Sequence, residues 1–177
     1  MLSSTMQLYA YWRSLAHGGL PNLRNFHSLS IAALVPHMIS VEVHEQFANY
    51  RILAVGDSVD ASYGSNLAGR RFGEIALGPS TPDILRDYQV CALDRVAILS
   101  RQTFLVDAAG PYVHERMLLP FEIGSSGRVG QIIAGLFFDR PYPGEAWADA
   151  ITDWNEEERT VFDLAGNIID SDRTDPR

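Results

Sequence analysis

The stretch from Tyr50 to Ile75 places the strongest constraint on the fold, because it joins a strand-like run to short pieces separated by glycines. Residues Tyr50–Val55 are mostly apolar and partly β-branched, which favours a strand. The chain then turns at Gly56, and later glycines divide the rest of the stretch into pieces too short for a three-turn helix (Gly64, Gly69 and Gly73). The pattern predicts a strand followed by a helical connector over one face of a sheet, with room for a ligand beneath it.

Four further strands are expected from apolar alternation and turn signals. Residues Met38–His44 alternate between apolar and polar side chains and form a hairpin with Tyr50–Val55. The other three strands are separated by Gly-containing turns and cover Val96–Val106, Tyr112–Phe121 and Arg128–Phe138. The sequence therefore predicts an α+β fold, with a five-stranded antiparallel sheet and a helical connector on one face.

Helices are expected at both ends of the chain and in its middle. The first, Thr5–Ala16, has an apolar stripe that must pack on the sheet or on a second copy of the chain (Leu8, Tyr11, Trp12 and Leu15). We predict that this stripe forms a homodimer interface. The middle helix begins at Thr81 and ends near Arg95. The last covers Asp153–Ile169, with Asp153 and Glu156 as a capping box.

Several short motifs occur in the order and spacing of one bacterial family. They are Tyr11-Trp12, Leu34–His37, Tyr50 to Gly56, Leu67-x-Gly69 and His114–Pro120. Over roughly Met6 to Phe138, the chain resembles the short PAS-like proteins that begin with a Tyr-Trp helix. It departs from their pattern at Asp57, where a small residue such as Thr is expected.

The resemblance implies a PAS-like sheet core over residues 37–139, preceded by a helical cap (1–36). A linker, the last helix and a polar tail come after the core (140–177). The resemblance also implies a non-catalytic sensory domain for signal transduction, which binds a small molecule or a protein partner. Such a domain passes its state through flanking helices to a separate output or regulatory protein. Two alternatives stay open: a small enzyme that uses Arg116, His114 and Tyr88, or a ligand-free structural dimerisation module.

The expected ligand site lies between the middle helix and the sheet. Its predicted residues combine apolar walls with a few polar groups (Tyr63, Tyr88, Cys91, His114 and Arg116). If Arg116 points inward, it can hold a ligand carboxylate. Arg51 and Glu115 are expected to form a structural ion pair, and the sequence leaves open which face of their strands is inward.

Composition and missing motifs exclude several other classes. The net charge of −8, without a basic cluster, argues against a nucleic-acid partner. No leader and no long apolar run is present, so we expect a cytoplasmic protein without a membrane segment. The histidines lack metal-ligand spacing, and we expect no metal. The PAS-like resemblance implies two cofactor signatures that can be checked: flavin-binding members carry an Asn-Cys-Arg-Phe-Leu run, and haem-binding members usually hold the iron with a histidine on the middle helix. The run is missing and Thr81–Arg95 contains no histidine, so we expect neither flavin nor haem. A small organic ligand, as yet unidentified, stays open.

Overall fold

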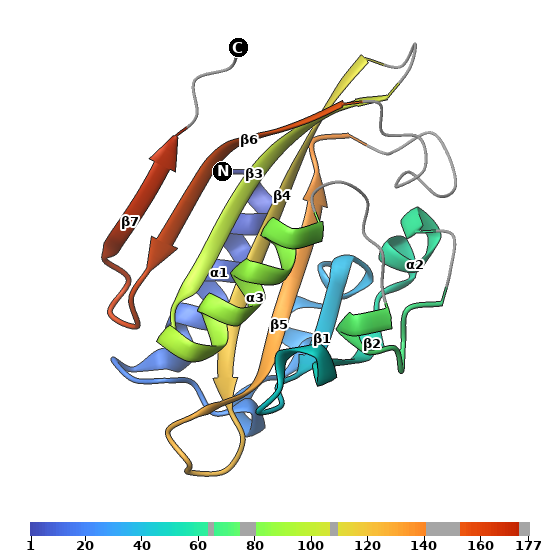
Figure 1. The fold of residues 1–177 in the computed structure, drawn as a ribbon. Helices are drawn as coiled ribbons and strands as arrows, with labels where there is room; N and C mark the ends of the chain where they lie inside the picture. Colours follow the sequence, from blue (N-terminus) through green and yellow to red (C-terminus); the bar gives the residue numbers. More distant parts are fainter. Residues whose placement is uncertain (64–65, 75–80, 107–109, 141–152, 174–177) are drawn as a thin grey trace.

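The computed structural model describes residues 1–63, 66–74, 81–106, 110–140 and 153–173. Its centre is one antiparallel sheet of seven strands in the order β2-β1-β5-β4-β3-β6-β7 (Figure 1). The strands are β1 (Met38–Glu42), β2 (Arg51–Val55), β3 (Ala97–Val106), β4 (Gly110–Glu122), β5 (Val129–Phe138), β6 (Asp153–Phe162) and β7 (Ile168–Arg173). The predicted five-stranded PAS-like sheet is therefore wrong, because β6 and β7 extend the sheet beyond β3.

The predicted C-terminal helix over Asp153–Ile169 is also wrong, since this segment forms the β6–β7 hairpin. The turn between the two strands contains Gly166, whose φ of 84° lies in the left-handed region that favours glycine. Asp163 fixes this turn, because its carboxylate accepts hydrogen bonds from the backbone N–H and side-chain amide of Asn167, both at 2.8 Å. A helix through this segment would have to break these contacts. It would also leave the long strand β3 without a partner on that side.

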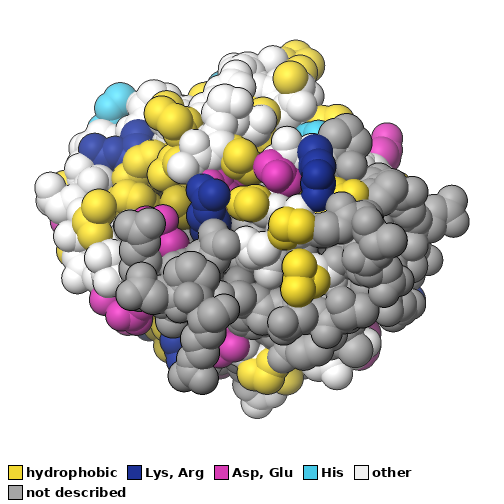
Figure 2. All heavy atoms as spheres, turned by 90° about the horizontal axis from the view of Figure 1, so that it is seen from above, with side chains coloured by type: hydrophobic (Ala, Val, Ile, Leu, Met, Phe, Trp, Pro, Cys, Tyr) yellow, Lys and Arg dark blue, Asp and Glu magenta, His cyan; other side chains and the backbone are white. Residues whose placement is uncertain are grey.

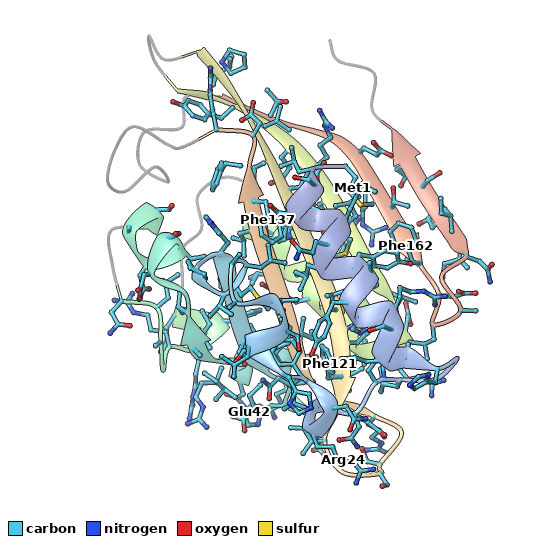
Figure 3. All side chains as sticks on the ribbon, turned by 180° about the vertical axis from the view of Figure 1, so that it is seen from behind. Met1, Arg24, Glu42, Phe121, Phe137 and Phe162 are labelled. Atoms are coloured by element: carbon cyan, nitrogen blue, oxygen red, sulfur yellow. The ribbon has the colours of Figure 1, made fainter. Side chains whose placement is uncertain are left out.

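Two helices cover opposite faces of the sheet. Helix α1 (Ser3–Ala16) lies on one face, and helix α3 (Thr81–Asp94) lies on the other (Figures 1 and 3). The side chains of each strand alternate between these two layers: Ile98 packs in the core on the α3 side, and Leu99 packs in the core on the α1 side. Figure 3 shows Phe121, Phe137 and Phe162 on the face that α1 covers. The molecule thus has three layers, helix, sheet and helix, with two apolar cores.

The apolar stripe of α1 packs on the sheet of its own chain. Leu8 and Trp12 are fully buried there, and the indole Nε1 of Trp12 donates a hydrogen bond of 3.0 Å to the carbonyl oxygen of Pro120. Tyr11 and Leu15 are partly buried against the same core. Leu8 and Trp12 are therefore not available to a second copy of the chain. The predicted homodimer stays a prediction, but these two side chains do not supply its interface.

Where the structure describes it, the connector between β2 and α3 contains two short elements. They are α2 (Asp57–Tyr63) and a 3₁₀ turn at Phe72–Glu74. Other 3₁₀ turns occur between α1 and β2, at Leu23–Asn25, Ser28–Ile31, Val35–His37 and Phe47–Asn49. Within the described ranges, none of the helices has the length and apolar character needed to cross a membrane.

Candidate functional site

A cluster of charged and polar side chains interrupts the apolar core between α3 and the sheet. Ser100 of β3 lies directly opposite Arg116 of β4 on one side and Arg159 of β6 on the other. Side chains paired in this way share one face of the sheet, here the face covered by α3. Asp87 of α3 points toward all three. We call these four residues the Asp87 cluster, and all four are buried.

The carboxylate of Asp87 connects the helix to three strands. Its Oδ2 accepts hydrogen bonds from Arg116 Nη2 at 2.7 Å and from Ser100 Oγ at 2.8 Å. Its Oδ1 accepts one from Arg159 Nε, also at 2.8 Å. Arg159 Nη1 lies 3.5 Å from the carboxylate of Asp170 in β7. A chain of ion pairs therefore runs from β4 through α3 to the C-terminal hairpin.

Asp87 is ionised in this environment. Burial raises the pKa of its carboxyl group, but the charges of Arg116 and Arg159 and the hydrogen bonds from Arg159 and Ser100 outweigh burial. Together they hold the pKa below its ordinary value. One carboxylate thus serves two guanidinium groups.

Ser100, Arg116 and Arg159 form one polar row across the strands, and a second polar row lies next to it. Two residues beyond Ser100 on β3 is Gln102, and its cross-strand partner is His114 of β4. Both side chains are buried on the α3 side, and the His114 ring lies 4.7 Å from the ring of Phe138. Burial, together with the positive charge of Arg116, lowers the pKa of His114 to about 3. The imidazole is therefore neutral at neutral pH.

Two side chains in these rows have polar atoms without hydrogen-bond partners among the described residues. In the described part of the chain, neither the Oε1 nor the Nε2 atom of Gln102 has a hydrogen-bond partner, and the residue is only 1% exposed. The Nε atom of Arg116, in a residue that is 2% exposed, likewise makes no hydrogen bond to a described residue. Buried polar groups in folded proteins are nearly always bonded, so each exception calls for an explanation. These donors and acceptors can recognise a bound molecule.

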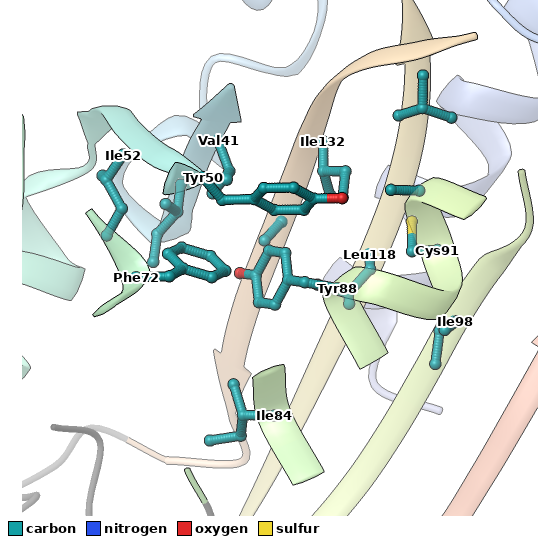
Figure 4. Packing of buried hydrophobic residues seen from close by; sticks show 14 of the residues in the cluster. Val41, Tyr50, Ile52, Phe72, Ile84, Tyr88, Cys91, Ile98, Leu118 and Ile132 are labelled. Atoms are coloured by element: carbon teal, nitrogen blue, oxygen red, sulfur yellow. The ribbon is translucent and has the colours of Figure 1, made fainter. Parts of the chain in front are cut away.

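The predicted ligand residues fall into two groups. His114 and Arg116 lie in the two polar rows described above. Tyr88 and Cys91 instead belong to the apolar core under α3, where the Tyr88 ring meets the Phe72 ring edge-on at 4.9 Å (Figure 4). Burial raises the pKa of the Cys91 thiol well above its ordinary value, and the charge of Asp87 adds to the effect. The side chain of Tyr63 lies outside the described part of the structure.

The predicted pair between Arg51 and Glu115 is replaced by other contacts. Arg51 lies on the edge strand β2, three strands away from β4, and its Nη2 is 2.9 Å from the carboxylate of Glu42. Glu115 is buried on the opposite face from Arg116, where it accepts a hydrogen bond of 2.7 Å from the backbone N–H of Leu2. Glu115 also lies 3.6 Å from Arg101. The sheet order separates Arg51 from Glu115, and no local pattern in the sequence predicts that order.

A separate open pocket of about 620 Å³ lies at the C-terminal end of α3. Apolar residues such as Val43 and Ala92 line part of it, and Arg95 and Arg128 are among its charged residues. No residue of the Asp87 cluster lines it. Seen from above, the described surface mixes hydrophobic side chains with arginine and acidic ones (Figure 2). Among the described residues, no group of three or more His, Cys, Asp or Glu is arranged to hold a metal ion.

The fold and the buried rows define an α+β domain with a charged, hydrogen-bonding site between one helix and its sheet. No protein-family model matches the chain, and no curated protein matches it. The likeness to PAS-like proteins therefore stays a prediction.

Proposed function

We propose that this chain is a non-catalytic regulatory domain that binds a small polar molecule beside Gln102 and Arg116. One observation carries the proposal: both polar atoms of the Gln102 amide are buried without a hydrogen-bond partner among the described residues. An unsatisfied buried polar group costs about 1–3 kcal/mol, so keeping one here favours a role that a packing residue cannot fill. A ligand that bonds to Gln102 would remove this cost.

The Asp87 cluster supplies a route by which occupancy can alter the rest of the molecule. Arg116 lies diagonally across the β3–β4 pair from Gln102 and donates a hydrogen bond to Asp87 of α3, which also accepts one from Arg159 of β6. Arg159 in turn contacts Asp170 of β7. A ligand that contacts Arg116 therefore biases the packing of α3 and of the β6–β7 hairpin. We propose that a separate partner protein binds these elements and responds to this change. The sensory role follows the PAS-like resemblance, and we place the domain in the cytoplasm.

The enzyme alternative receives less support from the same residues. A general base works best when its pKa lies near the operating pH, and the pKa of His114 is about 3. The thiol of Cys91 is fully buried, and its raised pKa keeps it protonated. Tyr88 lies in the apolar core rather than in the polar rows. These properties favour binding over catalysis.

Native mass spectrometry of freshly purified protein tests the proposal. We expect the wild type to carry a bound small molecule, and we expect Gln102→Leu to have lost it. The exposed residue Gln7 provides the matched control, because Gln7→Leu makes the same change on the outer side of α1.

Thermal unfolding supplies a second readout. Without a ligand, Gln102→Leu should be at least as stable as the wild type, because it removes two unbonded polar atoms from the interior. A ligand retained equally by the wild type and Gln102→Leu would contradict the proposed site. A wild type that carries no bound molecule would also contradict it. So would a Gln102→Leu variant that unfolds at a lower temperature than the ligand-free wild type.

A further inference from the structure

The pattern of unbonded atoms beside the Asp87 cluster narrows the chemistry of the ligand. Arg116 is a permanent cation, and it shares its carboxylate partner, Asp87, with Arg159. Its Nε–H group has no acceptor among the described residues. The strongest acceptor for a buried guanidinium N–H is an anionic oxygen, because charge-assisted hydrogen bonds are about twice as strong as neutral ones. The missing group is therefore best supplied by a carboxylate.

Gln102 adds a second requirement. It lies diagonally across the β3–β4 pair from Arg116, because Ser100 is opposite Arg116 and Gln102 is opposite His114. Diagonal neighbours of this kind are about 7–8 Å apart between backbones and closer between side chains. The Gln102 amide offers both a donor and an acceptor, which suits a hydroxyl group.

We infer that the ligand is a small hydroxycarboxylate, whose carboxylate accepts from Arg116 Nε and whose hydroxyl group bonds to the Gln102 amide. This inference rests on the proposed function, since it names the ligand class of the same site. The neutral imidazole of His114 lies beside Gln102 and adds no charge that would repel or attract the anion.

Three small probes separate the two requirements. Glycolate carries a carboxylate and a hydroxyl group, acetate carries the carboxylate alone, and glycolamide keeps the shape of glycolate without the charge. Each is titrated into the wild type by calorimetry at an ionic strength held constant with sodium chloride. We expect glycolate to bind more tightly than acetate and glycolamide not to bind. Each lost hydrogen bond to a charged group should weaken binding about tenfold or more.

Two variants assign the contacts. Arg116→Lys keeps a cation for Asp87 but lacks the Nε–H group, so it should bind glycolate and acetate at least about tenfold more weakly. Gln102→Leu should reduce the affinity for glycolate to that for acetate. The control is Arg86→Lys on the exposed side of α3, which should bind as the wild type does. Circular dichroism of each variant checks that it is folded before titration.

The outcomes distinguish this inference from the proposed function. Glycolamide binding as tightly as glycolate, or no binding of any of the three probes, overturns the hydroxycarboxylate inference. The proposed function survives this result if native mass spectrometry still finds a ligand that depends on Gln102. Equal affinity of acetate for the wild type and Arg116→Lys places the anion elsewhere, as in the pocket that contains Arg95 and Arg128, and also overturns the inference.

Discussion

Asp87 is a buried charged residue on the side of α3 that otherwise packs apolar side chains on the sheet. Its carboxylate balances Arg116 and Arg159, which reach it from two strands on either side of β3. Removing one member of a buried ion pair is more damaging than replacing the whole set, because the remaining charge stays buried without a partner. Within the Asp87 cluster, Asp87 is therefore the residue whose loss should affect the fold most.

We predict that Asp87→Asn lowers the free energy of unfolding by about 3–5 kcal/mol at neutral pH, because it leaves two guanidinium groups without their carboxylate. Urea unfolding measures this loss. Asp83→Asn, at an exposed position one turn earlier in α3, is the control and should change stability little. Equal stability of the two variants would show that the Asp87 cluster contributes no net stability.

We also predict that the difference in unfolding free energy between the wild type and Asp87→Asn depends on pH. The folded-state pKa of Asp87 lies below its ordinary value of 3.8, so its stabilising contribution is fully present above that pH. The contribution is lost as the pH falls through the folded-state pKa. The difference in stability between the wild type and Asp87→Asn should therefore be constant from neutral pH down to about pH 5 and shrink below pH 4.

A single residue in the sequence could have revealed this site. Asp87 occurs within the apolar stripe of the middle helix, three residues after Ile84 and one before Tyr88, where a charge is unexpected. Ser100 and Gln102 carry no such signal, because alternating polar residues in a strand usually face solvent. Arg159 was beyond reach, since the segment that contains it was predicted to be a helix.

At the scale of elements, the sequence patterns identified those with strong local periodicity. Strands β1 to β5 occur close to the predicted positions, and so do the N-terminal helix (α1) and the middle helix (α3). The β6–β7 hairpin was missed because Asp153 and Glu156 match a capping box and the apolar residues after them also fit a helical stripe. Tertiary pairing decided the outcome, since β3 pairs with β6 along almost its whole length. The turn at Gly166-Asn167 was the local signal against a helix.

Gly56 marks a close contact between elements. A Cβ atom built there would lie 2.3 Å from the carbonyl oxygen of Val35 and 2.4 Å from backbone atoms of Pro36. We predict that Gly56→Ala lowers the free energy of unfolding by about 1–3 kcal/mol, because the backbone must move apart to admit a methyl group. Gly19→Ala is the matched control, as its Cβ would meet nothing closer than 3.9 Å. Chemical denaturation should show no loss in the control, and a similar loss in both would contradict the contact.

At the scale of the whole molecule, α1 acts as the cover of one sheet face. Its Trp12 is fully buried and hydrogen-bonded to the end of β4. We predict that Trp12→Glu destabilises the fold by about 3–5 kcal/mol or more, because it removes a large buried ring and buries a charge. Met6→Glu, at an exposed position of the same helix, should leave stability unchanged.

Sedimentation of the same variants distinguishes this role from dimerisation. If α1 forms a subunit interface, Trp12→Glu will stay folded with wild-type stability and change only from dimer to monomer. If α1 covers its own sheet, the variant will lose stability whatever the oligomeric state of the wild type. The structure favours the second result, because Leu8 and Trp12 are already buried within one chain.

The position of β1 between β2 and β5 has a consequence for the order of events during synthesis. Met38 pairs with Gly135, so β1 and β2 leave the ribosome long before the strand that joins them to the sheet exists. Strands β3, β4 and β5 follow one another as neighbours and can assemble as they emerge. Trp12 also cannot form its hydrogen bond early, because the acceptor is the carbonyl group of Pro120, which is synthesised much later. Strands β1 and β2 can pair with each other before that point, but we expect the first third of the chain to stay undocked from the sheet until β5 is complete. This makes it the segment most in need of protection by chaperones.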